Sequence, residues 1–100
     1  MVCGNTVYLA GLISEDWNGD ISQQAREVFT QIDFLLAKAG SDKKRILSMT
    51  CWIKDFNDYA SFNEAYDDWI DCDSLPARAT VRADMLDEKI RIEIMCVATL

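Results

Sequence analysis

The stretch DISQQAREVFTQIDFLLAKAG, residues 20–40, decides the fold because it predicts a long amphipathic helix with both ends marked. Asp20 precedes Ile21 and is followed three residues later by Gln23, which is the pattern of a capping box. Gly40 stands where helices commonly end in a left-handed glycine. Apolar residues recur at steps of three and four, at Ile21, Ala25, Val28, Phe29, Ile32, Leu35, Leu36 and Ala39. One face of this helix is therefore expected to be buried against another layer.

Strand-like segments lie on both sides of this helix. Four segments have the β-branched and aromatic composition of strands: 6–13, 45–53, 79–85 and 90–100. A second helix is predicted after Asn57 or Asp58, either of which can cap it. Its apolar stripe is Tyr59, Phe62, Ala65, Tyr66, Trp69 and Ile70. The order β-α-β-α-β-β predicts an α+β fold with a mixed sheet and two helices packed on one face.

Chain length and net charge limit the classes of function and partner that are expected. One hundred residues predict a single domain over residues 1–100. The net charge of −7 argues against nucleic acid as a partner, since such binding depends on cationic contacts to phosphate. No apolar run approaches the roughly 20 residues that span a bilayer, and no basic-then-apolar leader follows Met1. We therefore expect no membrane partner and a cytoplasmic location.

The four cysteines do not suggest a metal site. No pair has CxxC spacing and the chain has no histidine, which removes the usual zinc sites and most histidine-based catalysis. Cys51 and Cys96 lie in apolar strand-like runs and are expected in the core, whereas Cys72 lies in a polar loop and is expected to be accessible. An acidic cluster at Glu64, Asp67, Asp68, Asp71 and Asp73 lacks the spacing of a calcium loop and is interpreted as a solvated helix face. We expect no metal and no cofactor.

The two faces of the sheet are both partly apolar. If residues 46–53 form a strand, alternation places one set of side chains on one face and the other set on the opposite face: Leu47, Met49, Cys51 and Ile53, and Ile46, Ser48, Thr50 and Trp52. Two helices cover only one side of such a sheet, so an apolar side is left uncovered and predicts a partner, most simply another copy of the chain. Trp52, Tyr66 and Trp69 are expected to pack in the core rather than line a cleft.

Arg78 follows the only proline, Pro76, at the mouth of the third predicted strand. Alternation puts Arg78 and Arg82 on one side of that strand, and the small apolar Ala79 and Val81 on the other. The apolar set is expected under the helices, so both arginines should face the partner side, where Glu93 could pair with them. Arg78 is then either half of an interface ion pair or a bidentate anchor for a small carboxylate. Spacing leaves both readings open.

At this point the chain resembles the Rid/YjgF-type enamine/imine deaminases. The stretches that carry the resemblance span nearly the whole chain in order: GNTVYLAG, DISQQAREVFTQIDFLLAKAG, ILSMTCWIKDFNDYASFNEAYDDW, PARATV and IRIEIMCVA. The most specific feature is Pro76-Ala77-Arg78 followed by Glu93, with Asn63 in the second helix.

The resemblance implies a chorismate-mutase-like fold and a homotrimer with clefts between subunits. It implies hydrolysis of 2-enamine or 2-imino acids, such as 2-aminoacrylate, to 2-oxo acids and ammonia without a cofactor. On this reading Arg78 binds the substrate carboxylate and Glu93 positions the attacking water, while Asn63 lies close to the cleft. Thr80, Ala10 and Gly11 are the other expected substrate-binding positions.

Three departures from the family pattern concern this site. The family usually carries a cleft tyrosine on a strand before GNTVYLAG, and that strand is missing or reduced here. Ala10-Gly11-Leu12 replaces Ser-Gly-Gln, and Thr80 replaces a cysteine. A second hypothesis follows, in which the same cleft binds a small carboxylate without turnover and acts as a regulatory module. An endoribonuclease, an activity attached to relatives, is a third reading, and the acidity and missing histidine weigh against it.

Overall fold

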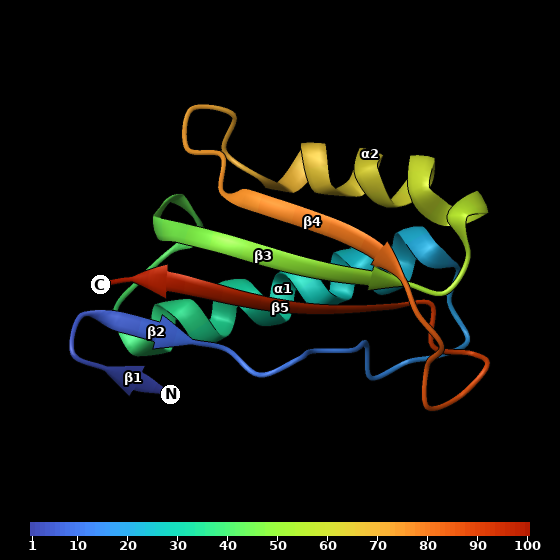
Figure 1. Ribbon diagram of the computed structural model, residues 1–100, viewed down its shortest axis with the longest axis horizontal. Coiled ribbons are helices and arrows are strands. Elements are labelled where there is room, and N and C mark those ends of the chain that lie inside the picture. The colour runs from blue at the N-terminus through green and yellow to red at the C-terminus, as the bar shows by residue number, and fades with distance from the viewer.

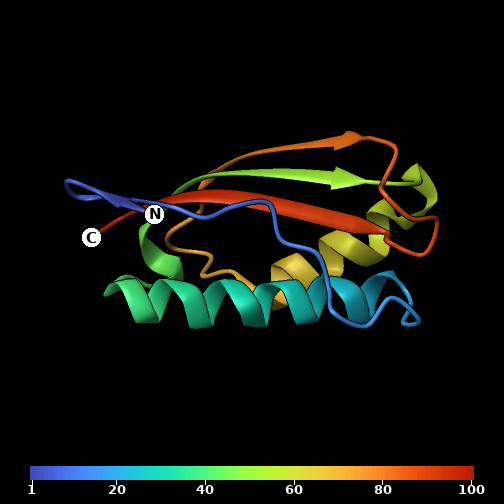
Figure 2. The ribbon, with the colours of Figure 1, turned by 90° about the horizontal axis from the view of Figure 1, so that it is seen from below.

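The computed structural model describes residues 1–100 as one five-stranded sheet with both helices on one side (Figures 1 and 2). The elements are β1 (Val2–Cys3), β2 (Thr6–Tyr8), α1 (Ile21–Ala39), β3 (Ile46–Ile53), α2 (Tyr59–Trp69), β4 (Ala77–Arg82) and β5 (Ile92–Thr99), with short 3₁₀ turns at Lys43–Arg45 and Phe56–Asp58. The strand order is β1-β2-β5-β3-β4, in which only the β3–β4 pair is parallel. The predicted α+β fold and mixed sheet are confirmed, and β1 is an additional strand.

Helix α1 begins and ends where its sequence signals lie. The Asp20 side chain accepts from the Gln23 backbone N–H at 2.9 Å, and the Gln23 side chain accepts from the Asp20 N–H at 2.9 Å. Gly40 has a φ of 90°, and its N–H donates to the Ala37 carbonyl at 3.1 Å. The capping box and the left-handed glycine are therefore both confirmed.

The core lies between the helices and one face of the sheet. It is a single cluster of buried residues to which α1, α2 and the central strands β3 and β5 contribute. Cys51 is 0% exposed and Cys96 is 1% exposed, so both are core residues as predicted. Neither helix combines the length and the apolarity that crossing a membrane requires.

The faces of two strands differ from the expectation. A bulge at the start of β3 buries Ile46 and leaves Leu47 53% exposed, because the register shifts between Ile46 and Ser48. In β4 the arginines, not the small apolar residues, point toward the helix side. Parallel pairing sets Arg78 beside Met49, a buried residue of that side, so the predicted orientation was wrong.

The segment after β2 leaves the sheet and returns to it. Leu9 still donates to the Cys96 carbonyl, and Leu12 exchanges two backbone hydrogen bonds with Ile94. Between them Ala10 and Gly11 bulge out of regular pairing, which makes β2 shorter than the predicted strand. This bulge lies over the side chain of Glu93.

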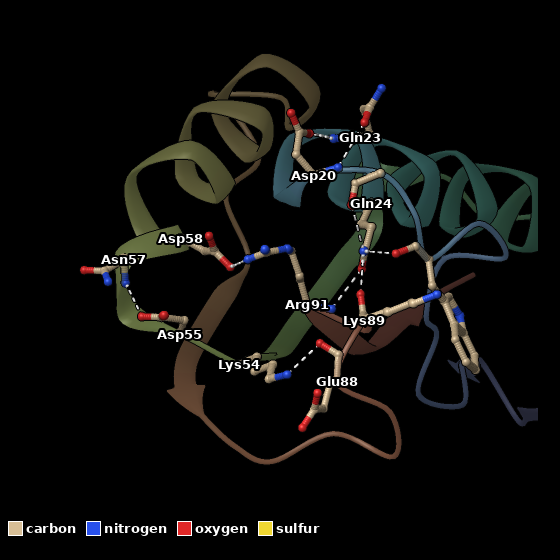
Figure 3. Close-up of polar contacts among 12 residues, drawn as sticks. Asp20, Gln23, Gln24, Lys54, Asp55, Asn57, Asp58, Glu88, Lys89 and Arg91 are labelled. Atoms are coloured by element: carbon tan, nitrogen blue, oxygen red, sulfur yellow. Dashed lines mark hydrogen bonds and ion pairs between the residues drawn. The ribbon is translucent and has the colours of Figure 1, made fainter.

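A polar network fastens the beginnings of both helices to the segment just before β5 (Figure 3). Gln24 is 1% exposed; its amide nitrogen donates to the Lys89 carbonyl at 2.8 Å, and its amide oxygen accepts from the Arg91 N–H at 2.9 Å. The guanidinium of Arg91 pairs with Asp58 at 2.9 Å. Asp58, immediately before Tyr59, therefore makes no side-chain cap for α2, contrary to the predicted option, but it ties the start of the helix to Arg91, the residue before β5.

Candidate functional site

Arg78 lies on β4, an edge strand of the sheet, and its side chain contacts α2. Its guanidinium carbon stands 4.3 Å from the centre of the Tyr66 ring and 5.6 Å from that of Phe62. Its Nη2 donates to the Tyr59 hydroxyl at 3.3 Å. Aromatic residues on one face of α2 thus hold the guanidinium by cation–π contact and one long hydrogen bond.

No anion within the chain neutralises Arg78. The four ion pairs of the structure involve Arg26, Lys44, Arg45 and Arg91, so Arg78 makes no ion pair with Glu93 of the same chain. Arg78 Nη1 is buried without a hydrogen-bond partner.

Thr80 lies on the same face of β4, two residues beyond Arg78. Its Oγ1 is also buried without a hydrogen-bond partner, and these two atoms are the only such side-chain nitrogen or oxygen atoms in the chain. Unpartnered buried polar atoms are costly and rare. We name Arg78, Thr80, Tyr59, Asn63 and Tyr66 the arginine cluster.

The thiol beneath this cluster does not supply the missing negative charge. Burial raises the pKa of Cys51 from 9.0 to about 12, although the Arg78 charge and the Thr80 hydroxyl act in the opposite direction. Burial also raises the pKa of the Tyr66 phenol. Both groups are therefore neutral near pH 7, and the guanidinium remains an uncompensated cation.

Asn63 joins the arginine cluster through helix geometry. It lies four residues after Tyr59 and three before Tyr66, which places all three on one side of α2. Its amide donates weakly to Asp67 at 3.5 Å. Asn63 therefore lies on the same side of α2 as the two tyrosines that contact Arg78.

Glu93 occupies the other face of the sheet. It pairs across strands with Trp52, and both line a cavity of about 210 Å³ together with Ala83, Asp84 and Met85. The expectation that Trp52 is a core residue was therefore wrong, because it points to the face without helices. Tyr66 is buried as expected, and Trp69 packs against the core from a partly buried position.

The absence of a side chain at Gly11 leaves the space that the Glu93 carboxylate occupies. A Cβ added at Gly11 would lie 2.3 Å from Glu93 Oε2, so only glycine permits this approach. Ala10 is exposed beside it. We name Glu93, Gly11, Ala10 and Trp52 the glutamate cluster.

The two clusters do not meet within one chain. Arg78 aligns with Met49 and Glu93 with Trp52, three residues apart along β3 and on opposite faces of the sheet. Three residues correspond to roughly 10 Å along a strand, and the sheet itself lies between the side chains. The structure therefore separates the predicted site residues into two half-sites.

Sequence reasoning missed the aromatic residues around Arg78. The signal was present, since Tyr59, Phe62 and Tyr66 recur at steps of three and four in the predicted second helix. The spacing of that stripe predicts core packing, and it carries no information about the side of the sheet on which Arg78 lies.

One group of possible metal ligands lies elsewhere. Asp71, Cys72 and Asp73 bring their ligand atoms within 4.8 Å of one another, and Cys72 is exposed as predicted. Asp71 accepts from the Asp73 N–H and lies 3.7 Å from Lys44. Because α2 ends at Trp69, this is a surface turn and not the predicted helix face, and we assign no ion to it.

Comparison with known proteins gives the family. The family model described as endoribonuclease L-PSP matches residues 1–100. A RutC family protein of Haemophilus influenzae is 42% identical over 96 residues, covering 95% of this chain and 83% of that protein.

Solved structures agree with this match. A YjgF family member from Neisseria meningitidis superposes with a TM-score of 0.94 at 33% identity, covering 98% of this chain and 82% of that one. A Rid family protein of Yersinia pestis gives 0.90 at 28% identity, covering 99% and 83%. The chain therefore has the chorismate-mutase-like fold and belongs to the Rid/YjgF family, also described as RutC and endoribonuclease L-PSP.

Proposed function

We propose that the protein hydrolyses small 2-enamine or 2-imino acids, such as 2-aminoacrylate, to 2-oxo acids and ammonia. The observation that carries the proposal is the buried, unpartnered Nη1 of Arg78, in a guanidinium that no carboxylate of this acidic chain neutralises. A planar carboxylate is the anion that best matches a guanidinium, and lysine does not reproduce that geometry. Arg78 is the substrate anchor in this proposal.

The site is completed by a second copy of the chain. A substrate carboxylate held by the arginine cluster cannot reach Glu93 of the same chain, because the sheet separates them. The face without helices exposes Tyr8, Val81 and Met95 by 47%, 44% and 40%, which supports its burial by another copy. We propose a homotrimer in which the arginine cluster of one copy faces the glutamate cluster of the next.

The chemistry follows from this arrangement. The enamine takes a proton from solvent at C3 and becomes the iminium, and water then adds to C2 as the Glu93 carboxylate accepts one of the water protons. Glu93 returns that proton to the nitrogen of the resulting carbinolamine, the C2–N bond breaks to release ammonia, and the hydroxyl gives its proton to solvent as the 2-oxo group forms. Arg78 holds the carboxylate throughout, with Asn63 and the Thr80 hydroxyl beside it. The scheme uses only groups of the chain and includes no cofactor.

The test uses 2-aminoacrylate generated in situ by a dehydratase acting on serine. The wild type should accelerate its conversion to pyruvate, whereas Arg78→Ala and Glu93→Gln should not. Circular dichroism checks that both variants are folded. Retained acceleration by folded Arg78→Ala would contradict the assignment of the anchor.

A carboxylate-binding module without turnover is the second candidate. It is favoured by the surroundings of Glu93, since Ala10, Gly11 and Trp52 offer no hydroxyl or carboxamide to orient a water. This candidate predicts Arg78-dependent thermal stabilisation by 2-oxobutyrate with no acceleration of 2-aminoacrylate loss. Turnover that depends on Glu93 decides against it.

RNA cleavage has less support, although the family description names an endoribonuclease. The net charge is −7, and the residues that β3, β4 and β5 place on the face without helices include no lysine or arginine. Affinity for RNA depends on cationic contacts to phosphate, so these features favour a small acid as substrate.

A further inference from the structure

We infer that Tyr59 is a specificity-determining residue that donates its hydroxyl to the bound carboxylate beside Arg78. The inference rests on the proposed carboxylate site and adds a second donor to it, from α2 instead of β4. Tyr59 is the first residue of α2 and is 42% exposed at the edge of the arginine cluster.

The contacts of the guanidinium leave its Nη1 without a hydrogen-bond partner. The guanidinium carbon lies 4.3 Å from the centre of the Tyr66 ring, and a cation–π contact of this kind does not use the N–H groups as hydrogen-bond donors. Of these groups, Nη2 points to the Tyr59 oxygen at 3.3 Å and Nη1 has no partner. A carboxylate that pairs with the Nη1 and Nη2 edge therefore brings one oxygen to Nη1 and the other toward Tyr59.

The phenol is the acceptor in its contact with Arg78, so its own proton is directed elsewhere. The 3.3 Å separation between Nη2 and the phenol oxygen is longer than a strong hydrogen bond. A carboxylate oxygen can therefore accept from both Arg78 Nη2 and the Tyr59 hydroxyl. No other hydrogen bond of the Tyr59 hydroxyl exists within the chain. Its proton is thus available to the second carboxylate oxygen.

The position of Tyr59 is fixed from outside the site. Asp58, its neighbour in sequence, pairs with Arg91 at 2.9 Å (Figure 3), and the N–H of Tyr59 donates within the preceding 3₁₀ turn to Phe56. The first turn of α2 is therefore anchored to Arg91, and the phenol is held beside Arg78 before a ligand arrives. Such preorganisation is the condition for a residue to act in selecting a ligand.

Recognition by both groups selects a ligand with two carboxylate oxygens. A carboxamide replaces one oxygen by an N–H₂ donor, which would face the donors Arg78 Nη2 and Tyr59 Oη. The arginine cluster should therefore bind 2-oxobutyrate and reject 2-oxobutyramide. Because the carboxylate does not change during the reaction, Tyr59 should affect binding of substrate and transition state equally, and so KM but not kcat.

The experiment is calorimetric titration of 2-oxobutyrate and 2-oxobutyramide into wild type, Tyr59→Phe, Ser61→Ala and Arg78→Ala. Tyr59→Phe keeps the ring and should raise Kd for 2-oxobutyrate by about tenfold to a hundredfold, as loss of one hydrogen bond to a charged group implies. Ser61→Ala removes an exposed hydroxyl of the same helix and should leave Kd unchanged. In the 2-aminoacrylate assay, Tyr59→Phe should raise KM and leave kcat unchanged.

The outcomes separate this inference from the proposed function. Equal Kd for wild type and Tyr59→Phe overturns the role of Tyr59, and Arg78-dependent binding in the same series would leave the anchor intact. An equal rise of Kd in Ser61→Ala also overturns it, because the effect would then belong to the helix. Absence of binding by wild type, or unchanged binding by Arg78→Ala, overturns the carboxylate site itself and both claims with it.

Discussion

At the scale of single residues, the proposed function depends on where the side chains of Arg78 and Glu93 point. Each lies among groups that suit one part of an imine hydrolysis: an aromatic cradle and an unpartnered N–H for a carboxylate, and a glycine that makes room for a second carboxylate. Within one chain the Arg78 cation and the Glu93 carboxylate do not neutralise each other, because the sheet lies between them.

Replacing Gly11 by alanine tests the glutamate cluster on its own. The new Cβ would lie 2.3 Å from Glu93 Oε2 and must displace the carboxylate. We expect turnover of 2-aminoacrylate to fall by about tenfold or more, as misplacement of a catalytic group implies. Calorimetric affinity for 2-oxobutyrate is the control and should change little. Turnover equal to wild type would show that the position of Glu93 is unimportant.

Arg78→Lys tests the planarity of the anchor. Lysine keeps the charge but cannot present two parallel N–H groups or stack on Tyr66 in the same way. The affinity for 2-oxobutyrate should fall by about tenfold or more, since a bidentate charged pair is replaced by a single contact. Thermal shift measured against ligand concentration checks this, and equal affinity would reduce Arg78 to a point charge.

At the scale of elements, the helices are fixed to the sheet by few but buried polar contacts. Gln24 of α1 donates to the carbonyls of Trp17, Gly19 and Lys89, which joins two loops that are distant in sequence. Through Arg91 the same region is tied to the start of α2, and so to the arginine cluster (Figure 3).

Gln24→Leu should therefore destabilise the fold. The substitution leaves buried backbone groups without partners, which implies a loss of about 2–4 kcal/mol in the free energy of unfolding. Asp20→Ala, which removes only the side-chain cap of α1, should cost about 1 kcal/mol. Urea denaturation measures both. A smaller effect for Gln24→Leu than for Asp20→Ala would contradict the importance of this network.

The buried thiols of Cys51 on β3 and Cys96 on β5 predict how the stability of the fold changes at alkaline pH. Burial raises the pKa of Cys51 to about 12 and that of Cys96 to about 11, both above the ordinary value of 9.0. Their contribution to stability is complete below pH 9 and is lost as the pH rises toward these values, because the unfolded thiols ionise first. The melting temperature should fall between pH 9 and pH 11, and less so in a Cys51→Ala/Cys96→Ala variant. An equal fall in both proteins would assign the effect to other groups.

The sequence was sufficient to predict the helices and strands. It was not sufficient to predict which face of the sheet each side chain occupies. The capping residues and periodicity of α1 predicted its ends, because those signals are local. The side of the sheet that Arg78 faces depends on the register of β4 against β3, a long-range property that alternation alone leaves undecided. Similarly, the β3 bulge that reverses Ile46 and Leu47 has no signal in the local pattern.

At the scale of the whole molecule, one layer of helices leaves an apolar face of the sheet bare (Figure 2). We expect light scattering to give the mass of three chains of 11.4 kDa. Met95→Lys, on the bare face, should dissociate the assembly and abolish turnover. Phe34→Lys, on α1 and 67% exposed, is the control and should leave both unchanged. A monomeric, fully active Met95→Lys variant would contradict a site between copies.

The most direct test of the central claim is complementation between two inactive variants. Arg78→Ala and Glu93→Gln chains are unfolded together in equal amounts, refolded and assayed with 2-aminoacrylate. If each site takes Arg78 from one copy and Glu93 from the next, about a quarter of the sites regain both residues and about a quarter of wild-type activity returns. If both residues act within one chain, the mixture stays as inactive as its components.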